Sequence, residues 1–259
     1  MTDRVTLITG ASTGIGAELA RVFASNGHRL ALVDRRGDRL QALATEMVAA
    51  GGAAPILIAC DLEQSDACDK IAGALAAERV EVEFVVNNAG FGLFGYANEL
   101  DRAEQLGIIA VNIVALTICR YDLRTAWSGI VAHPQPGFAC RLSTRPRMAV
   151  YYASKAYVLS FSEALRNELG PRGVRITALC PSSVKSEFQA RAGIKPGLEH
   201  EILNVLASDV AQAGYRGLMA NKRLVLPGLG TRMIPFLLRL FPRGFILAAI
   251  GRIQLGKPR

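Results

Sequence analysis

Tyr151 and Lys155 are the two residues whose types and spacing could carry acid–base chemistry in this sequence. Residues four apart lie on one face of a helix, so a helical segment would point the Tyr151 hydroxyl and the Lys155 ammonium into one pocket. A fixed cation close by favours the phenolate and lowers the tyrosine pKa from its ordinary value of about 10. The pair is therefore a candidate proton donor and acceptor, although Tyr-x-x-x-Lys also arises by chance and needs support from other segments.

A glycine loop near the N-terminus has the surroundings of a nucleotide cradle. The β-rich run from Val5 to Thr9 leads into Gly10-Ala11-Ser12-Thr13-Gly14-Ile15-Gly16, and a helical pattern follows. Glycines allow a tight turn and close approach to a pyrophosphate, while the helix N-terminus offers free N–H groups. Strand, loop and helix together predict a dinucleotide site formed by Gly10, Ser12, Thr13, Gly14, Ile15 and Gly16.

The second predicted strand, from Arg29 to Val33, ends at charged residues that favour different cofactors. Asp34 could accept hydrogen bonds from the adenosine ribose and repel a 2′-phosphate, which favours NAD. Arg35 and Arg36 could pair with that phosphate, which favours NADP. The balance leans slightly to NAD, and a solvated strand end is the simpler interpretation.

Strands and helices then alternate, which predicts a parallel, doubly wound sheet in a three-layer α/β/α arrangement. We expect one Rossmann-like domain over residues 1–259, with a substrate lid at about 183–215 and an apolar, basic C-terminal extension at about 229–259. The apolar strand from Val82 to Val86 runs into Asn87-Asn88-Ala89-Gly90. Small and amide residues at a strand's C-terminal end lie where such sheets bind ligands.

The ordered motifs resemble those of the short-chain dehydrogenase/reductase family over nearly the whole chain. They are the glycine loop from Thr9 to Gly16, Asp61, the Asn87–Gly90 run, Asn112, and Tyr151 with Lys155. The resemblance implies hydride transfer between NAD(P) and a carbonyl or secondary alcohol. It also implies that the protein forms homodimers or homotetramers.

The same resemblance assigns roles to individual residues. Asn112 would hold a water in a proton relay to Lys155, and Lys155 would also hold the nicotinamide ribose. The predicted cofactor contacts outside the glycine loop are Asp34, Arg35, Asp61, Leu62, Asn88, Ala89, Gly90, Tyr151, Lys155, Pro181 and Val184. Ser182 stands where the family usually has glycine, which changes the expected loop geometry beside the nicotinamide.

One stretch, at about residues 121–147, does not fit the pattern. It shows neither strand alternation nor a sensible helix, and Phe138 occupies the place where the family has a catalytic serine. Reading permitted codons for residues 133–147 one nucleotide later can spell Ile-Leu-Asn-Leu-Ala-Ser and more of a family-like segment. We interpret this as a pair of compensating frameshifts. The alternative is a dinucleotide-binding protein with impaired catalysis that lacks the serine; Ser128 and Ser143 have the wrong spacing to replace it.

Composition excludes few classes of partner. The formal net charge is +8, but Lys and Arg are dispersed without aromatic interleaving, so we expect no nucleic-acid partner. Five scattered cysteines predict reduced thiols, and with the lack of a signal-like apolar start they favour a cytoplasmic protein. Three scattered histidines predict no metal site.

The C-terminal segment from Met233 to Ile250 is apolar and flanked by arginines. It is too short to span a bilayer, and prolines interrupt it. A packed dimer surface, a cap over a lipophilic pocket and an interfacial membrane helix all remain open, in that order. From this apolar third we expect a lipophilic ketone or acyl substrate.

Overall fold

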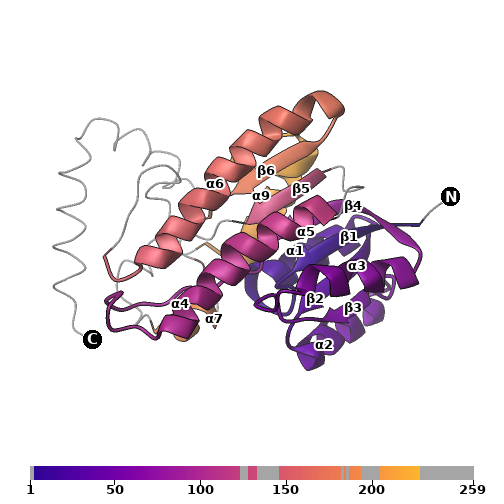
Figure 1. Cartoon of the computed structure of the whole chain (residues 1–259). Helices are drawn as coiled ribbons and strands as arrows, with labels where there is room; N and C mark the ends of the chain where they lie inside the picture. Colours follow the sequence, from indigo (N-terminus) through magenta and orange to yellow (C-terminus); the bar gives the residue numbers. More distant parts are fainter. Residues whose placement is uncertain are drawn as a thin grey trace.

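The computed structural model describes residues 3–122, 128–132, 146–181, 184, 187–193 and 205–227. Seven parallel strands form one sheet in the order β3-β2-β1-β4-β5-β6-β7 (Figure 1). The strands are β1 Asp3–Thr9, β2 Arg29–Asp34, β3 Ile56–Ala59, β4 Val80–Asn87, β5 Ser128–Ala132, β6 Arg175–Leu179 and β7 Leu224–Val225. The predicted parallel, doubly wound sheet is confirmed.

Helices cover both faces of this sheet, as the crossover connections of a parallel sheet require. On one face α1 contacts both α2 and α9, and on the other α3 contacts α5 and α4 contacts α6. The helices are α1 Gly14–Ser25, α2 Gly37–Ala49, α3 Ala67–Ala77, α4 Arg102–Ile109, the π-helical η1 Ala110–Ala115, α5 Leu116–Asp122, α6 Ala149–Leu169, the 3₁₀ turn η2 Gly170–Arg172, α7 Glu187–Arg191 and α9 Ala207–Met219.

Two apolar cores follow from the alternation of side chains along the strands. Ile8 on β1 and Leu32 on β2 pack into the core that contains α1 and α9. Their neighbours Leu7 and Ala31 point the other way, into the core that contains α3. Because side chains alternate between faces, strands covered on both sides are apolar almost throughout.

The order of the strands reverses beside β1, which lies between β2 and β4. The carboxyl end of β1 is in register with that of β4, where Ile8 pairs with Val86. The glycine loop after β1 and the Asn-Asn-Ala-Gly run after β4 therefore share one edge of the sheet. Ligands bind at this switch point in doubly wound folds.

Two expectations for the second half of the chain need correction. Residues 128–132 form the central strand β5 between β4 and β6, inside the stretch that shows no strand pattern. Pairing on both sides imposes the strand there, where local alternation is lacking. The predicted lid also extends too far, since α9 packs against α1 and buries Val210 and Leu218 in the core. The frameshift hypothesis stays a prediction.

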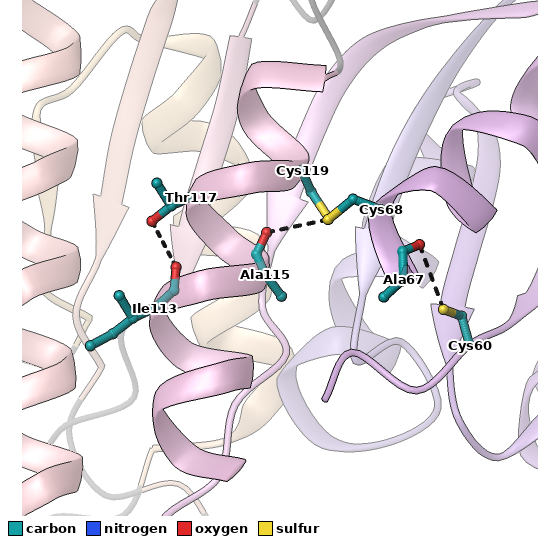
Figure 2. The surroundings of a disulfide bond; sticks show 7 residues. All are labelled: Cys60, Ala67, Cys68, Ile113, Ala115, Thr117 and Cys119. Carbon is teal, nitrogen blue, oxygen red and sulfur yellow. Dashed lines mark hydrogen bonds between the residues drawn. A yellow bond between two sulfur atoms is a disulfide. The ribbon is translucent and has the colours of Figure 1, made fainter. Parts of the chain in front are cut away.

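A disulfide between Cys68 and Cys119 contradicts the expectation of reduced thiols. Figure 2 shows the bond joining α3 to α5 across the second core, and Cys180 is also disulfide-bonded. The two sulfurs meet because α3 and α5 pack side by side, which sequence spacing does not reveal. Among the described residues, Cys60 is a buried free thiol.

Candidate active site

The glycine loop folds as a cradle whose glycines are required by geometry. Gly10 and Gly14 have φ of +64° and +59°, which disfavours residues with a side chain. A Cβ on Gly16 would lie 2.1 Å from the carbonyl oxygen of Gly10. The loop can thus turn and bring the start of α1 close to the sheet edge only with glycine at these positions.

Asn88 and Thr9 join this loop to the end of β4. The Asn88 amide donates to the carbonyl oxygens of Thr9 and Gly10, each at 3.0 Å. The Thr9 hydroxyl accepts from the backbone N–H groups of Asn88 and Ala89, each at 3.1 Å. These bonds make Asn88 a residue that shapes the cradle, consistent with its predicted place in the cofactor site.

The loop fits the pyrophosphate of a dinucleotide. The helix α1 begins at Gly14 and Ile15. Thr13 is its N-cap residue, but among the described residues the Thr13 side chain accepts no hydrogen bond from the first turn of the helix. The first-turn N–H groups, with the positive end of the helix dipole, therefore suit an anion. The Ser12 and Thr13 hydroxyls lie beside them and accept hydrogen bonds from Arg36 at 2.7 and 3.0 Å.

The end of β2 places opposite charges in contact. Asp34 accepts from the backbone N–H groups of Ser12, at 3.4 Å, and Arg36, at 3.0 Å. Its Oδ1 is also 3.5 Å from the Nε of Arg36. Arg35 is exposed at the same strand end. Asp34 and Arg36 therefore form a contact pair at the end of β2, and the binding of the ribose there stays a prediction.

The remaining predicted cofactor residues surround the same edge. Asp61 follows β3 and accepts from the backbone N–H of Glu63 at 3.1 Å. Leu62 is partly buried between two apolar clusters. Pro181 is buried after β6, and Val184 forms an isolated bridge with Val205. Their contact with adenine or nicotinamide stays a prediction.

Tyr151 and Lys155 share one face of α6, as their spacing predicts. The Lys155 Nζ lies 5.7 Å from the centroid of the Tyr151 ring, and each residue is only 2% exposed. Gly90 makes this approach possible, because a Cβ there would lie 3.1 Å from that Nζ and 2.9 Å from the Asn112 Oδ1. The loop after β4 thus presents backbone directly to the candidate catalytic lysine.

The pKa values in this structure reverse one expectation. Burial raises the pKa of Tyr151 well above its ordinary value of 10, and Tyr152 adds to the effect. Burial also lowers the pKa of Lys155 from 10.5 to about 8. The net pKa of Tyr151 is therefore raised rather than lowered in this structure, and a contribution of Lys155 to that pKa stays a prediction. Removal of both groups from water disfavours their charged forms and outweighs their proximity.

Asn112 lies in the π-helical turn η1, a feature often found at functional sites. Its side chain accepts from the backbone N–H of Phe91 at 3.2 Å and donates to the carbonyl of Phe91 at 3.1 Å. It also donates to the Ser154 hydroxyl at 2.9 Å. Asn112 thus ties the loop after β4 to α6, and its role in a water relay stays a prediction.

Sequence reasoning missed the residues that cover Tyr151. The Phe188 ring on α7 lies 5.2 Å from the Tyr151 ring, and a Cβ on Gly92 would lie 2.7 Å from that ring. Phe94 and Met148 pack in the same cluster. Phe188 falls inside the predicted lid, but no spacing signal points to it. Phe138, at the position where the resemblance places the family's serine, lies outside the described residues.

A doubly wound sheet with a glycine cradle at its switch point and a Tyr–Lys pair on the neighbouring helix defines a nucleotide-dependent oxidoreductase. Comparison with known proteins supports this class. A family model described as short chain dehydrogenase matches residues 4–196. The chain belongs to the short-chain dehydrogenase family and is an NAD(P)-dependent oxidoreductase that acts on CH–OH or C=O groups.

Individual relatives agree with this assignment. Sulfoacetaldehyde reductase from Chromohalobacter salexigens is 35% identical over 193 residues, covering 73% of this chain and 75% of that protein. A short-chain dehydrogenase from Sphingobium yanoikuyae, solved with NADPH, is 28% identical with a TM-score of 0.77, covering 94% and 95% of the two chains. The bulky-bulky ketone specific alcohol dehydrogenase from Comamonas testosteroni is 25% identical with a TM-score of 0.74, covering 93% of each.

Proposed function

We propose that this oxidoreductase acts on a lipophilic ketone or acyl group, or on the corresponding secondary alcohol. The observation that carries this proposal is the apolar cluster that contains the candidate catalytic residue Tyr151. Met148, Tyr151 and Tyr152 are buried together, and Phe94 and Phe188 pack against them. Such surroundings favour an apolar substrate next to one polar reacting group. The Comamonas relative is named as specific for bulky-bulky ketones, which is in line with a ketone substrate here.

In the proposed mechanism, Tyr151 donates a proton to the carbonyl oxygen during reduction and accepts it during oxidation. The Lys155 ammonium stabilises the phenolate that forms, because the two groups share one buried space. Asn112 positions α6 through Ser154, so that Tyr151 keeps its place relative to the loop after β4. A bound nicotinamide supplies or accepts the hydride.

We also propose that NAD(H) is the preferred dinucleotide. Asp34 lies at the end of β2, where it can accept hydrogen bonds from ribose hydroxyls and repels a 2′-phosphate. The Arg36 guanidinium, which could bind that phosphate, already lies beside Asp34 and Glu187. Arg35 remains exposed and argues for NADP(H), so the preference is a balance of opposing charges.

The test is oxidation of NADH and NADPH in the presence of a panel of apolar ketones, with the Tyr151→Phe variant as the comparison. Loss of the proton donor should lower turnover by about 100- to 10,000-fold. Nucleotide binding should persist, because the cradle after β1 does not depend on the hydroxyl. Turnover that survives Tyr151→Phe unchanged would exclude the proposed mechanism.

The rival proposal is a dinucleotide-binding protein with impaired catalysis, because Phe138 replaces the expected serine. Losing one donor to the substrate oxygen can lower the rate by about 100-fold or more. The rival predicts that NADH stabilises the protein against heat while no ketone in the panel is reduced. Resequencing the coding DNA across residues 120–148 decides whether the serine is present.

We propose that the protein assembles as a homodimer or homotetramer through the outer face of α4, η1 and α5. Large apolar side chains are exposed there about once per turn, and Tyr157 on α6 is exposed beside them. The apolar members on the first three helices are Leu106, Ile109, Val114 and Ile118. A contiguous exposed apolar face of this kind is typical of a protein interface.

Among the described residues, the helical segment Arg102–Cys119 has the length and the apolar composition needed to cross a membrane. The same segment packs against α3 and α6 and carries Asn112, so we interpret it as part of the folded α/β domain and not as a membrane span. The proposed membrane contact of the C-terminal segment lies outside the described residues.

A further inference from the structure

The short helix α7 places one carboxylate on two arginines at the cofactor edge. Glu187 accepts from the Nη1 of Arg36 at 2.8 Å through one oxygen. Its other oxygen accepts from the Nη1 of Arg39 at 3.0 Å. Residues from two distant parts of the chain therefore meet at the end of β2, where the adenosine ribose is expected.

Arg36 is also bound to the loop that would hold the nucleotide. Its Nη2 donates to the hydroxyls of Ser12 and Thr13, at 2.7 and 3.0 Å. A guanidinium between two hydroxyls, with Arg39 next to it, offers the donors that a phosphate group needs. The Glu187 carboxylate already accepts hydrogen bonds from the Nη1 groups of Arg36 and Arg39, so these donors are occupied by the protein itself.

The charges favour this intramolecular pair at neutral pH. The hydrogen bond from Arg36 and the charges of both arginines lower the pKa of the Glu187 carboxyl below its ordinary value, so it is ionised. The same bond raises the pKa of Arg36, with Asp34 contributing. A phosphate that approached Arg36 would meet two carboxylates and would have to displace the one from α7.

The remainder of α7 reaches the other end of the site. Phe188, next to Glu187, packs on the Tyr151 ring at 5.2 Å between centroids. The Arg191 guanidinium lies 3.9 Å from the centroid of the Phe91 ring. One short helix thus spans from the ribose position to the candidate proton donor, so displacement of Glu187 would move the cover over Tyr151.

We propose that Glu187 is a specificity-determining residue, which competes with the 2′-phosphate of NADP(H) for Arg36 and Arg39. Binding of NADP(H) then requires α7 to leave this position, whereas NAD(H) leaves the Glu187 contacts in place. This inference rests on the proposed dinucleotide site between the glycine loop and β2. Glu187 would then be a second carboxylate, besides Asp34, that weakens binding of NADP(H), and it comes from a distant segment of the chain.

Two small nucleotides serve as ligands that test the effect of the 2′-phosphate by itself. Adenosine 2′,5′-bisphosphate carries the phosphate in question and 5′-AMP does not, so their affinities are measured by calorimetry on the full chain. In Glu187→Gln the affinity for the bisphosphate should rise about three- to tenfold, as expected for the loss of two exposed competing ion pairs. The affinity for 5′-AMP should change less than twofold.

Glu46→Gln is the matched control. Glu46 also receives two bonds of 2.8 Å from one arginine, Arg21, but lies on the outer side of α1 and α2. This variant should leave both affinities unchanged. In the unmutated protein the bisphosphate, but not 5′-AMP, should increase hydrogen exchange over residues 187–193.

The outcomes distinguish this inference from the proposed function. Equal changes for both nucleotides, no change, or weaker bisphosphate binding in Glu187→Gln would overturn the role of Glu187 and leave the dinucleotide site intact. If the folded, unmutated protein binds neither nucleotide, the proposed cofactor site itself fails, and the inference fails with it.

Discussion

At the scale of single residues, Lys155 is a candidate catalytic group whose burial lowers the stability of the folded protein. Lys155 is only 2% exposed beside Tyr151, and burial lowers its pKa from 10.5 to about 8. Below the lower value, both the folded and unfolded chains hold the proton, so the folded chain contains a buried cation. Between the two values only the unfolded chain holds it, so stability rises with pH in this window.

Lys155→Met should therefore stabilise the fold while abolishing turnover. At pH 7 the free energy of unfolding should rise by roughly 1–3 kcal/mol, the scale set by the lowered pKa. The gain should shrink at pH 9.5, because the unmutated protein has by then released most of the proton. Urea unfolding at both pH values, without nucleotide, measures the difference.

The control is Lys70→Met, since Lys70 is an exposed lysine on α3 that pairs with Asp66 at 2.9 Å. Its difference from the unmutated protein should be the same at both pH values. A gain for Lys155→Met that does not depend on pH would show that packing, and not the buried charge, causes it.

Much of the site could be predicted at this scale because its residues act through local geometry. A glycine with positive φ, or a Tyr and Lys one helical turn apart, carries its structural requirement in the sequence itself. The direction of the Tyr151 pKa could not be predicted, because it depends on burial by residues such as Phe188 that are distant in sequence.

At the scale of elements, α3 and α5 are held together by the Cys68–Cys119 disulfide, which closes a separation of 51 residues. Cys68 also lies 3.8 Å from the carbonyl oxygen of Ala115, at the end of the π-helical turn that carries Asn112 (Figure 2). The bond therefore supports the element that positions α6. A cytoplasmic location stays a prediction, and such bonds are rare in that reducing compartment.

Cys119→Ala should lower the free energy of unfolding by about 2–4 kcal/mol, because the unfolded chain regains the freedom of a long loop. Urea unfolding without reductant measures this loss, and Cys60→Ala, which removes a buried free thiol, is the control and should lose less. With reductant, the unmutated protein and Cys119→Ala should converge. Equal stabilities without reductant would mean that the bond does not form.

The helices and strands differ in how well they can be predicted from their own sequences. The strands β1 and β4 are continuous apolar runs that end at recognisable turns, and they were predicted close to their observed bounds. The strand β5 has no such pattern, because its place is set by pairing with β4 and β6. The helix α9 was partly assigned to the lid, since amphipathicity alone does not say which surface covers a helix.

At the scale of the whole molecule, the outer face of α4, η1 and α5 carries exposed apolar side chains within the part of the chain that the structure describes. Ile118 is 42% exposed, and the stacked pair Tyr157 and Phe161 lies on the adjacent helix. Asn112 and Tyr151 lie on the inner side of the same helices. Assembly through this face would therefore hold in place the two helices that carry the chemistry.

Ile118→Glu tests this assembly by placing a charge in the proposed interface. Burying an unpaired carboxylate is costly, so the variant should dissociate to monomers of 27.7 kDa in size-exclusion chromatography with light scattering. Val48→Glu is the matched control, since Val48 is a similarly exposed residue, 48%, on α2 away from this face. It should keep the mass of the unmutated protein. An unmutated protein that is monomeric at all concentrations, or an oligomer that survives Ile118→Glu, would assign this face another role.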